Sequence, residues 1–555
     1  MRFASACAAL PSLHRPASPS LLSLHPRTPH SASPPRPTTI RSIPAPASSS
    51  KSAAPTTAPT PSPPAISSSL VWNGVEYQNQ TRGSQITSGF DYLYTGVSAV
   101  SVSASVINTN YIKITVQAGN LTHYYMARSG YPHIYMGTYF TTEPDIHGLV
   151  RYIFRIPATL LPNGPTPSDI RNVTTTIESG DIFALSNGQT RSKHYSNMRV
   201  KDWSYIGASG SGVGMWVVRD NNEGASGGPF YRCLLNQCGG DQEITYIVNY
   251  GEAQTEAFRT GILNAYTFVA TSGGTPSTSI DTSWFSSMGL SGYLAPSGRG
   301  TVAGVGINGR DTAYTYTVGF SNSTAQYWTT AAASNGYFSC GGMRPGTYTM
   351  KFYKNELAVY SESVTVSAGA TTSLNTRTIT ADPSSQSVLW RIGNWDGTPT
   401  EFRNGSSITT MHPQDPRLSS WTPGTYVVGS SGNSNFPCYQ WKGVNGSQAV
   451  QFTLTAAQAA SARTLRIGIT VAYANARPVV TVNSWTSAVP AVSTQPATRT
   501  LTVGTYRGNN TTYTYSIPAS AFVTGTNTLT LAPASGSGGS LYLSAGYSID
   551  CVDLY

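Results

Sequence analysis

Short runs of alternating apolar and polar residues, separated by turns rich in glycine and asparagine, restrict the fold of this chain most strongly. Segments 111–116 and 150–155 both alternate with a period of two residues, which is the side-chain spacing on one face of a β-strand. Turn signals at 163–165, 179–181 and 209–212 separate such runs. The pattern predicts an all-β protein.

Three β-rich units follow one another along the 555 residues, a length that suits roughly two to four domains. We expect residues 70–287 to form a large β-sandwich and residues 288–381 a smaller fibronectin-III-like sandwich. Residues 385–555 are expected to form a jelly roll of the carbohydrate-binding kind. Residues 1–69 are rich in Pro, Ser, Ala and Arg, so a disordered low-complexity N-terminus is predicted there.

The chain is poor in charge, with 10% charged residues against a usual ~25%. Six positive charges of the net +10 lie in the first 70 residues, which contain no acidic residue. The rest is therefore only mildly basic and has no basic run typical of nucleic-acid binding. No apolar run is long enough for a membrane span.

Eight N-glycosylation triplets accompany this hydroxyl-rich composition and predict a secreted, extracellular glycoprotein. They begin at Asn79, Asn120, Asn172, Asn322, Asn404, Asn445, Asn509 and Asn510. In a secreted protein Cys233 and Cys238 are close enough to form a small loop disulfide. Cys340, Cys438 and Cys551 are expected to be buried single residues or to have partners that spacing does not identify.

The segment 188–196, which contains Thr190-Arg191-Ser192-Lys193, lies between Arg151 and the turn at 226–230. Together with the blocks at 143–146, 274–283 and 395–399, it resembles the rhamnogalacturonan lyases of polysaccharide lyase family 4, fungal type. The similarity covers roughly residues 74–555 and includes the three-domain order. It implies β-elimination of the rhamnogalacturonan I backbone of pectin, between rhamnose and galacturonic acid.

Such a reaction needs a group that neutralises the uronate carboxylate, a base for the proton on carbon 5, and an acid for the leaving oxygen. The resemblance implies that Arg151 binds the carboxylate, a task that suits its planar fork. It also implies that Lys193 is the base, which a lysine can be when burial or nearby cations favour its neutral form. Arg191 either supports Lys193 electrostatically or lies in solvent.

The chain departs from the family pattern in the next segment, where Glu252 occupies the position of the family's histidine. The strand before it has Thr245 and Ile247 in place of family tyrosines and keeps only Tyr246, which we predict to bind substrate. Glu252 is the candidate acid, because burial raises the pKa of some carboxyl groups enough for that role.

Other residues near a β face could replace the missing acid, namely His133 with Tyr135, or His194. Alternatively, the protein is a catalytically impaired homologue that binds pectin without cutting it. A glycoside hydrolase with paired carboxylates is disfavoured because acidic residues are sparse in the matched core.

No organic cofactor is implied. The expected partner is the pectin polysaccharide, and we expect a monomer that binds neither nucleic acid nor a membrane. Asp550 and Asp553 near the C-terminus are compatible with a Ca²⁺ site in the third domain, although two aspartates at this spacing are weak evidence for one. No cysteine spacing fits a zinc site.

Overall fold

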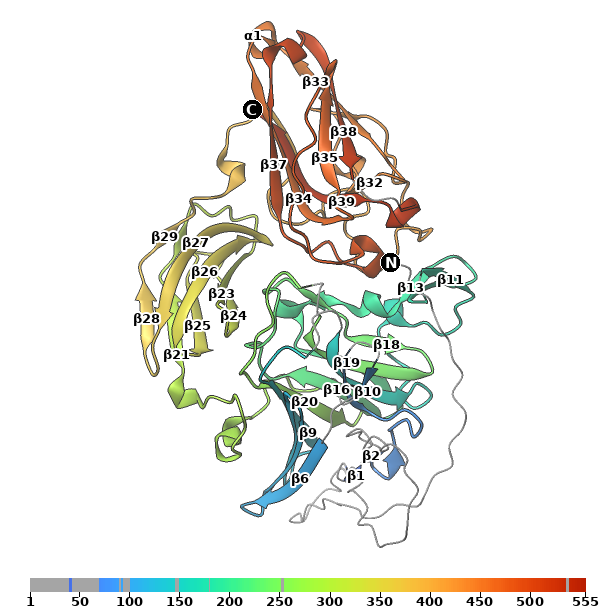
Figure 1. The fold of residues 1–555 in the computed structure, drawn as a ribbon, viewed down its shortest axis with the longest axis vertical. Helices are drawn as coiled ribbons and strands as arrows, with labels where there is room; N and C mark the ends of the chain where they lie inside the picture. The colour runs from blue at the N-terminus through green and yellow to red at the C-terminus, as the bar shows by residue number, and fades with distance from the viewer. Residues whose placement is uncertain are drawn as a thin grey trace, which may run out of the picture.

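The fold is described from a computed structural model, in which residues 39–41, 69–88, 91–92, 100–144, 149–178, 180–250, 254–535 and 539–555 are placed. Figure 1 shows three β-rich bodies, with the C-terminal one at the top of the view and the middle one beside the other two. The predicted all-β fold class is confirmed. Most of the predicted disordered segment 1–69 lies outside the described residues.

The N-terminal domain is a sandwich of two antiparallel sheets. One sheet has the order β18 (Asn236–Cys238), β19 (Asp241–Asn249), β10 (Val150–Pro157), β4 (Gln85–Ser88) and β5 (Asp91–Tyr92). The other has the order β15 (Tyr205–Gly210), β16 (Val213–Arg219), β20 (Asn264–Thr271), β9 (His133–Phe140), β8 (Leu121–Arg128), β7 (Tyr111–Ala118) and β6 (Val100–Ile107). Smaller pairings join β1 (Thr39–Arg41), β2 (Ser69–Trp72) and β3 (Val75–Glu76), and join β14 (Met198–Arg199) to β17 (Arg232–Cys233).

Alternation along β10 divides its side chains between the core and the opposite face of the sheet. Tyr152 and Phe154 are in the core, where the Phe154 ring stacks on Phe268 of the second sheet with centroids 4.5 Å apart. Arg151 and Arg155, one position out of phase, belong to the other face, as the period of two requires. The core thus fixes which face presents the arginines.

The middle domain packs two small sheets. They have the orders β25 (Phe338–Met343), β21 (Gly300–Gly304), β28 (Thr371–Leu374), and β24 (Gln326–Thr330), β23 (Tyr316–Ser321), β26 (Gly346–Lys354), β27 (Leu357–Val366). A short parallel pair joins β22 (Ile307–Asn308) to β29 (Arg377–Thr378).

The C-terminal domain is a second large sandwich. One sheet has the order β30 (Trp390–Gly393), β39 (Gly546–Leu554), β34 (Arg463–Tyr473) and β37 (Thr511–Ile517), with β32 (Tyr439–Trp441) also paired to β39. The other has the order β31 (Tyr426–Val427), β33 (Gln448–Leu454), β38 (Gly525–Ala534), β35 (Arg477–Val482) and β36 (Trp485–Thr486).

Helical structure among the described residues is limited to single turns in the loops. The α-helix α1 spans Ala456–Ala459. The 3-10 turns are η1 (Thr166–Ser168), η2 (Lys193–Ser196), η3 (Val200–Asp202), η5 (Ser283–Ser287), η6 (Pro296–Gly298), η7 (Pro383–Ser385), η8 (Asn433–Asn435), η9 (Thr500–Val503), η10 (Ala519–Ala521) and η11 (Leu541–Leu543).

Buried ionic groups join the domains. Glu223 of the N-terminal domain accepts two hydrogen bonds from Arg299, one from Arg344 and one from the Tyr327 hydroxyl, all from the chain that follows. Glu356 of the middle domain is fully buried and accepts from Tyr506 of the C-terminal domain at 3.0 Å. These contacts join the middle domain to each of the other two domains.

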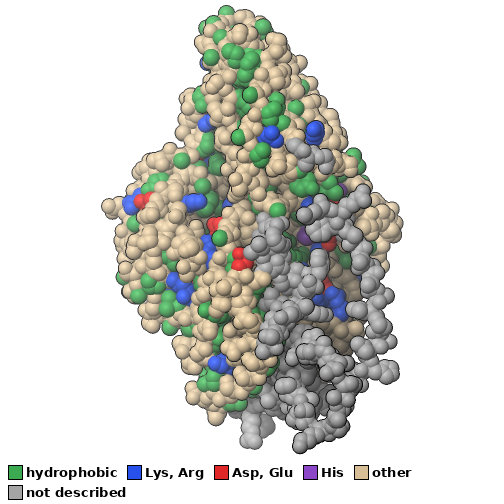
Figure 2. Space-filling view, viewed as in Figure 1, with side chains coloured by type: hydrophobic (Ala, Val, Ile, Leu, Met, Phe, Trp, Pro, Cys, Tyr) green, Lys and Arg blue, Asp and Glu red, His purple; other side chains and the backbone are tan. Residues whose placement is uncertain are grey.

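The visible surface in Figure 2 carries few and scattered charged side chains, in keeping with the composition. Among the described residues, no helix has the length and apolar character that crossing a membrane requires.

The predicted disulfide between Cys233 and Cys238 is wrong, because both are buried free thiols. Cys233 is paired with Met198 across β14 and β17, whereas Cys238 on β18 accepts a hydrogen bond from Gln242 at 3.1 Å. The short strands thus direct the two thiols into different surroundings. Burial raises the pKa of Cys233 to about 12 and that of Cys238 to about 11. Cys340, Cys438 and Cys551 are also buried and free.

Candidate active site

Lys193 lies at the end of a small three-stranded sheet formed by β11 (Thr175–Glu178), β12 (Ile182–Ala184) and β13 (Thr190–Ser192). Ile182 is paired with Ser192, so the residue before Ile182 faces the residue after Ser192. Those residues are Asp181 and Lys193, whose Oδ1 and Nζ atoms are 2.7 Å apart. The Ser192 hydroxyl accepts from the His194 N–H and starts η2, which turns the chain away from the strand.

Asp181 also contacts a cation from the C-terminal domain. Its Oδ2 is 3.0 Å from Nη2 of Arg499, whose Nη1 is 2.6 Å from Oε1 of Glu178. Burial alone would raise the pKa of Asp181, but the charge and the hydrogen bond of Lys193, together with the charge of Arg499, hold it below its ordinary value. Asp181 is therefore a carboxylate shared between a lysine and an arginine from different domains.

The same sheet is bonded to the C-terminal domain at a second point. The Thr190 N–H and hydroxyl both donate to Oδ2 of Asp415 at 2.7 Å, and the His412 N–H donates to the Thr190 hydroxyl at 3.0 Å. The Tyr195 hydroxyl donates to the Thr502 carbonyl at 3.0 Å. The position of Lys193 therefore depends on the docking of two domains.

Arg151 projects from β10 beside Ile247 of β19 and Thr87 of β4. It is 8% exposed, and its Nε has no hydrogen-bond partner among the described residues. Burial lowers the pKa of the guanidinium, while Glu243 and Asp181 oppose this effect. A buried arginine with an unpaired donor is suited to binding a carboxylate.

His194 links these groups electrostatically. Burial, and to a smaller extent the positive charges of Lys193, Arg499 and Arg151, lower the pKa of its imidazole to about 3. An imidazole with so low a pKa is neutral near pH 7, which disfavours His194 as an imidazolium acid for the leaving group. Arg151 and Lys193 thus both contribute to the electrostatic surroundings of His194.

Glu252 lies outside the described residues, so its role stays a prediction. The chain on either side of it is anchored: once its amide is oriented to satisfy both partners, Gln254 donates to the Ser226 carbonyl at 2.9 Å and accepts from the Tyr250 N–H at 3.1 Å. Tyr250 feels the charges of Arg151, Arg499 and Asp181. The segment that carries Glu252 therefore begins beside the charged cluster.

The structure does not support the predicted contact between Tyr246 and substrate, because Tyr246 is only 4% exposed. It stacks on Tyr266 with centroids 3.9 Å apart and packs against Trp203, inside the sandwich core. Period two places it opposite Arg151, so that it supports the sheet from within.

The other residues considered from sequence also face elsewhere. His133 and Tyr135 lie on β9, and the Tyr135 ring packs edge-on against Trp284 in a separate apolar cluster. Arg191 donates to the Thr190 carbonyl at 2.9 Å, and its electrostatic neighbours are Arg417, Asp169 and Asp415. Arg191 therefore does not support Lys193.

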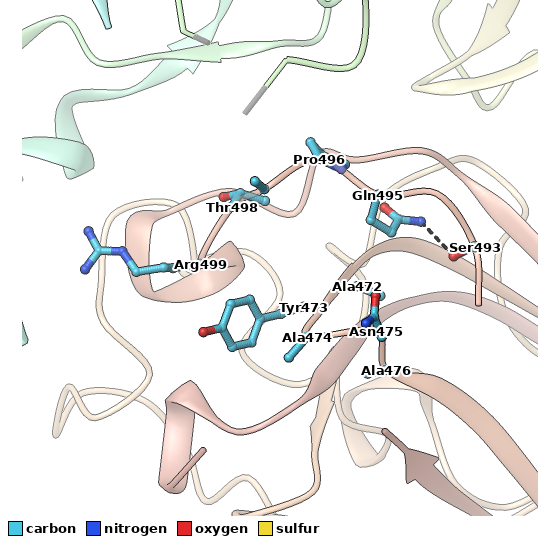
Figure 3. Close-up of a pocket in the computed structure, with 11 residues that line it drawn as sticks. Ala472, Tyr473, Ala474, Asn475, Ala476, Ser493, Gln495, Pro496, Thr498 and Arg499 are labelled. Carbon is cyan, nitrogen blue, oxygen red and sulfur yellow. Dashed lines mark hydrogen bonds between the residues drawn. The ribbon is translucent and has the colours of Figure 1, made fainter. Parts of the chain in front are cut away.

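A pocket of about 330 Å³ opens on the C-terminal domain beside Arg499. Figure 3 shows the Tyr473 ring and the Arg499 side chain at its wall, with Gln495 donating to Ser493. Alanine and proline residues provide most of the remaining lining. Among the described residues of the charged cluster, only Arg499 lines this pocket, and its guanidinium points away from the other lining residues.

The aspartates that suggested calcium have other partners. Asp553 accepts from Arg391, Arg466 and the Trp395 indole, and Asp550 accepts backbone N–H groups of Asp396 and Gly397. Within the described ranges, no group of three or more His, Cys, Asp or Glu side chains is arranged to hold a metal ion. The calcium expectation gains no support from this geometry and stays a prediction.

Sequence reasoning missed Asp181 and Arg499. Asp181 had a usable signal, because it follows a turn and its strand pairs with the one that ends at Lys193. Arg499 had none, because it is about 300 residues from Lys193 along the chain and contacts Asp181 only through the docking of two domains.

Comparison with known proteins agrees with this architecture in every domain. Residues 65–292 match the family model for rhamnogalacturonan lyase B, N-terminal, and residues 298–374 and 388–554 match those for domains II and III of polysaccharide lyase family 4. Rhamnogalacturonate lyase A of Emericella nidulans is 43% identical over 490 residues, covering 88% of this chain and 90% of that protein. Rhamnogalacturonate lyase A of Aspergillus aculeatus is 42% identical with the same coverage. The chain therefore belongs to the rhamnogalacturonan lyases of polysaccharide lyase family 4.

Proposed function

We propose that this protein is a secreted endolyase that cleaves the rhamnogalacturonan I backbone of pectin between rhamnose and galacturonic acid. The reaction is a β-elimination that leaves an unsaturated galacturonate at the new non-reducing end. The observation that carries the proposal is the cluster in which Lys193, 2.7 Å from Asp181, shares its electrostatic surroundings with the buried Arg151.

Arg151 binds the uronate carboxylate in this mechanism. Its burial removes competing water, which strengthens the ionic interaction, and its charge offsets the negative charge that develops beside carbon 5. The unpaired Nε gives it a donor that substrate binding would satisfy.

Lys193 removes the proton from carbon 5. The C5–H bond breaks as an N–H bond forms, its electron pair becomes the C4–C5 double bond, and the C4–O bond breaks. We assign the proton for the leaving oxygen to Glu252, and Tyr250, two residues before it, is the nearest described hydroxyl on that segment.

The test measures the ultraviolet absorbance of the unsaturated uronate released from rhamnogalacturonan I. Lys193→Ala should lower the rate by about 10²- to 10⁴-fold, the usual contribution of a general base. Lys201→Ala is the matched control, because Lys201 also lies in a 3-10 turn, η3, and its Nζ is 2.6 Å from Oδ1 of a carboxylate, Asp202. Equal losses in the two variants would contradict the role of Lys193.

The acid is tested separately with Glu252→Gln and Tyr250→Phe. Loss of rate in the first variant alone supports Glu252. A wild-type chain that is folded, binds rhamnogalacturonan and releases no unsaturated product, but gains activity as Glu252→His, would instead identify a pectin-binding homologue.

A further inference from the structure

We propose that Arg499 of the C-terminal domain is a positioning residue for the lyase reaction: by sharing Asp181 with Lys193, it lets Lys193 give up its proton and act as a base. This inference rests on the proposed function. It assigns the C-terminal domain a part in the chemistry.

The geometry divides one carboxylate between two cations. Oδ1 of Asp181 is 2.7 Å from Nζ of Lys193, and Oδ2 is 3.0 Å from Nη2 of Arg499. Each cation thus has its own oxygen, and neither blocks the other.

Arg499 is held in place independently of Lys193. Its Nη1 is 2.6 Å from Oε1 of Glu178, and Oε2 of Glu178 is 3.4 Å from Nε2 of His412. Arg499 is also the residue before η9, whose Thr502 carbonyl accepts from Tyr195. The guanidinium therefore stays beside Asp181 when Lys193 changes its charge.

The physical argument concerns the charge state that a base needs. A carboxylate next to an amine favours the protonated amine, which cannot take a proton. A second cation on the same carboxylate offsets that preference, because part of the negative charge is already neutralised. Among the described residues, the charged and titratable groups of the cluster that contains Lys193 are Asp181 and Glu178 from the β11–β12 hairpin, His194 from η2, Arg151 from β10, Tyr250 after β19, and Arg499 and His412 from the C-terminal domain.

Asp181 has a second use after proton transfer. When Lys193 takes the proton from carbon 5 it becomes an ammonium ion, and Asp181 is already in place to stabilise it. Arg499 itself exchanges no proton, since guanidinium groups stay protonated in proteins. Its effect is on the proportion of enzyme whose Lys193 is ready to react.

The experiment compares pH profiles of kcat/KM on rhamnogalacturonan I for the full chain and its variants. In Arg499→Gln the acid limb of the profile should move to higher pH by roughly 1 unit, with a smaller movement in Arg499→Lys. Asp181→Asn should move the limb to lower pH, because the neutral amide no longer favours the protonated form of the neighbouring amine.

Arg417→Gln is the matched control. Arg417 also belongs to the C-terminal domain and pairs with Asp415, which holds the same hairpin, but its carboxylate does not contact Lys193. It should leave the midpoint unchanged. A fall in rate that is the same at every pH in Arg499→Gln, or a midpoint that moves as little as in Arg417→Gln, would overturn the inference.

A second readout needs no turnover. The rate at which an amine-acylating reagent labels Lys193 in the folded chain, followed by peptide mass spectrometry, depends on its deprotonated fraction. The pH midpoint of labelling should rise in Arg499→Gln by the same roughly 1 unit. Arg499→Lys, in which the rise should be smaller, takes its place if Arg499→Gln does not fold. A labelling shift in a chain without lyase activity would retain the role of Arg499 and reject the proposed function.

Discussion

Replacement of Thr190 by valine tests how firmly the hairpin that carries Lys193 is held by the C-terminal domain. The Thr190 hydroxyl is fully buried, donates to the Asp415 carboxylate at 2.7 Å and accepts from the His412 N–H at 3.0 Å. Valine keeps the volume and removes both interactions. The change therefore isolates polar contacts from packing.

The magnitude follows from the two partners. A hydrogen bond to a charged acceptor contributes about 1.5–3 kcal/mol, and a buried donor left without a partner costs about 1–3 kcal/mol. Asp415 keeps the Thr190 N–H and Arg417, so the lower part of each range applies. We expect Thr190→Val to lower the free energy of hairpin opening by about 2–4 kcal/mol.

Hydrogen exchange of the amides in β12 and β13 measures this opening directly, and urea unfolding followed by tryptophan fluorescence shows whether the whole domain is affected. Because Lys193 loses its position when the hairpin opens, kcat should fall in parallel. Thr190→Ser keeps the hydroxyl and is the matched control. Destabilisation below about 1 kcal/mol, or equal effects of valine and serine, would refute the reasoning.

Three further predictions concern other sites. Hydrogen bonds from Arg299, Arg344 and Tyr327 outweigh burial and hold the pKa of Glu223 below its ordinary value, so the ionised Glu223 stabilises the folded protein above about pH 4.3 and this stabilisation fades below it. In urea titrations Glu223→Gln should therefore lower the free energy of unfolding by about 3 kcal/mol at pH 7 and by less at pH 3. A loss of stability that grows on acidification would contradict this. Burial, with the charge of Asp396, raises the pKa of Glu401 to about 7, so the folded protein keeps its full stability below the pKa that Glu401 has in the unfolded chain and loses part of it as pH rises through 7. Glu401→Gln should therefore raise the free energy of unfolding at pH 8 by at most about 3 kcal/mol and leave it unchanged at pH 4. Asn172 is exposed, whereas Asn445 is 6% exposed and donates to two backbone carbonyls. Peptide mass spectrometry of protein secreted from eukaryotic cells should therefore find a glycan on Asn172. A glycan on Asn445 would contradict the fold around that residue.

The sequence by itself determined the fold class and the local geometry of the strands. Alternation along 150–155 predicted that Arg151 and Tyr152 face opposite sides of a sheet, and the structure has them so. This succeeds because a strand has a fixed period of two, and only one face of it can enter the core. Tyr246 shows the same alternation, because it is paired with Tyr152 and its ring stacks on Tyr266 in the core.

Contacts between distant segments were decided by the tertiary structure alone. The spacing of Cys233 and Cys238 permitted a disulfide, but the pairing of β17 and β18 with different strands separated the thiols. The position of Arg499 beside Asp181 depends on the packing of two sandwiches, which no local pattern encodes. Through the family resemblance the sequence predicted Lys193 as a residue of the site, whereas only the folded chain shows which carboxylate and which second cation lie near it, because electrostatic environment depends on distance in space and not on distance along the chain.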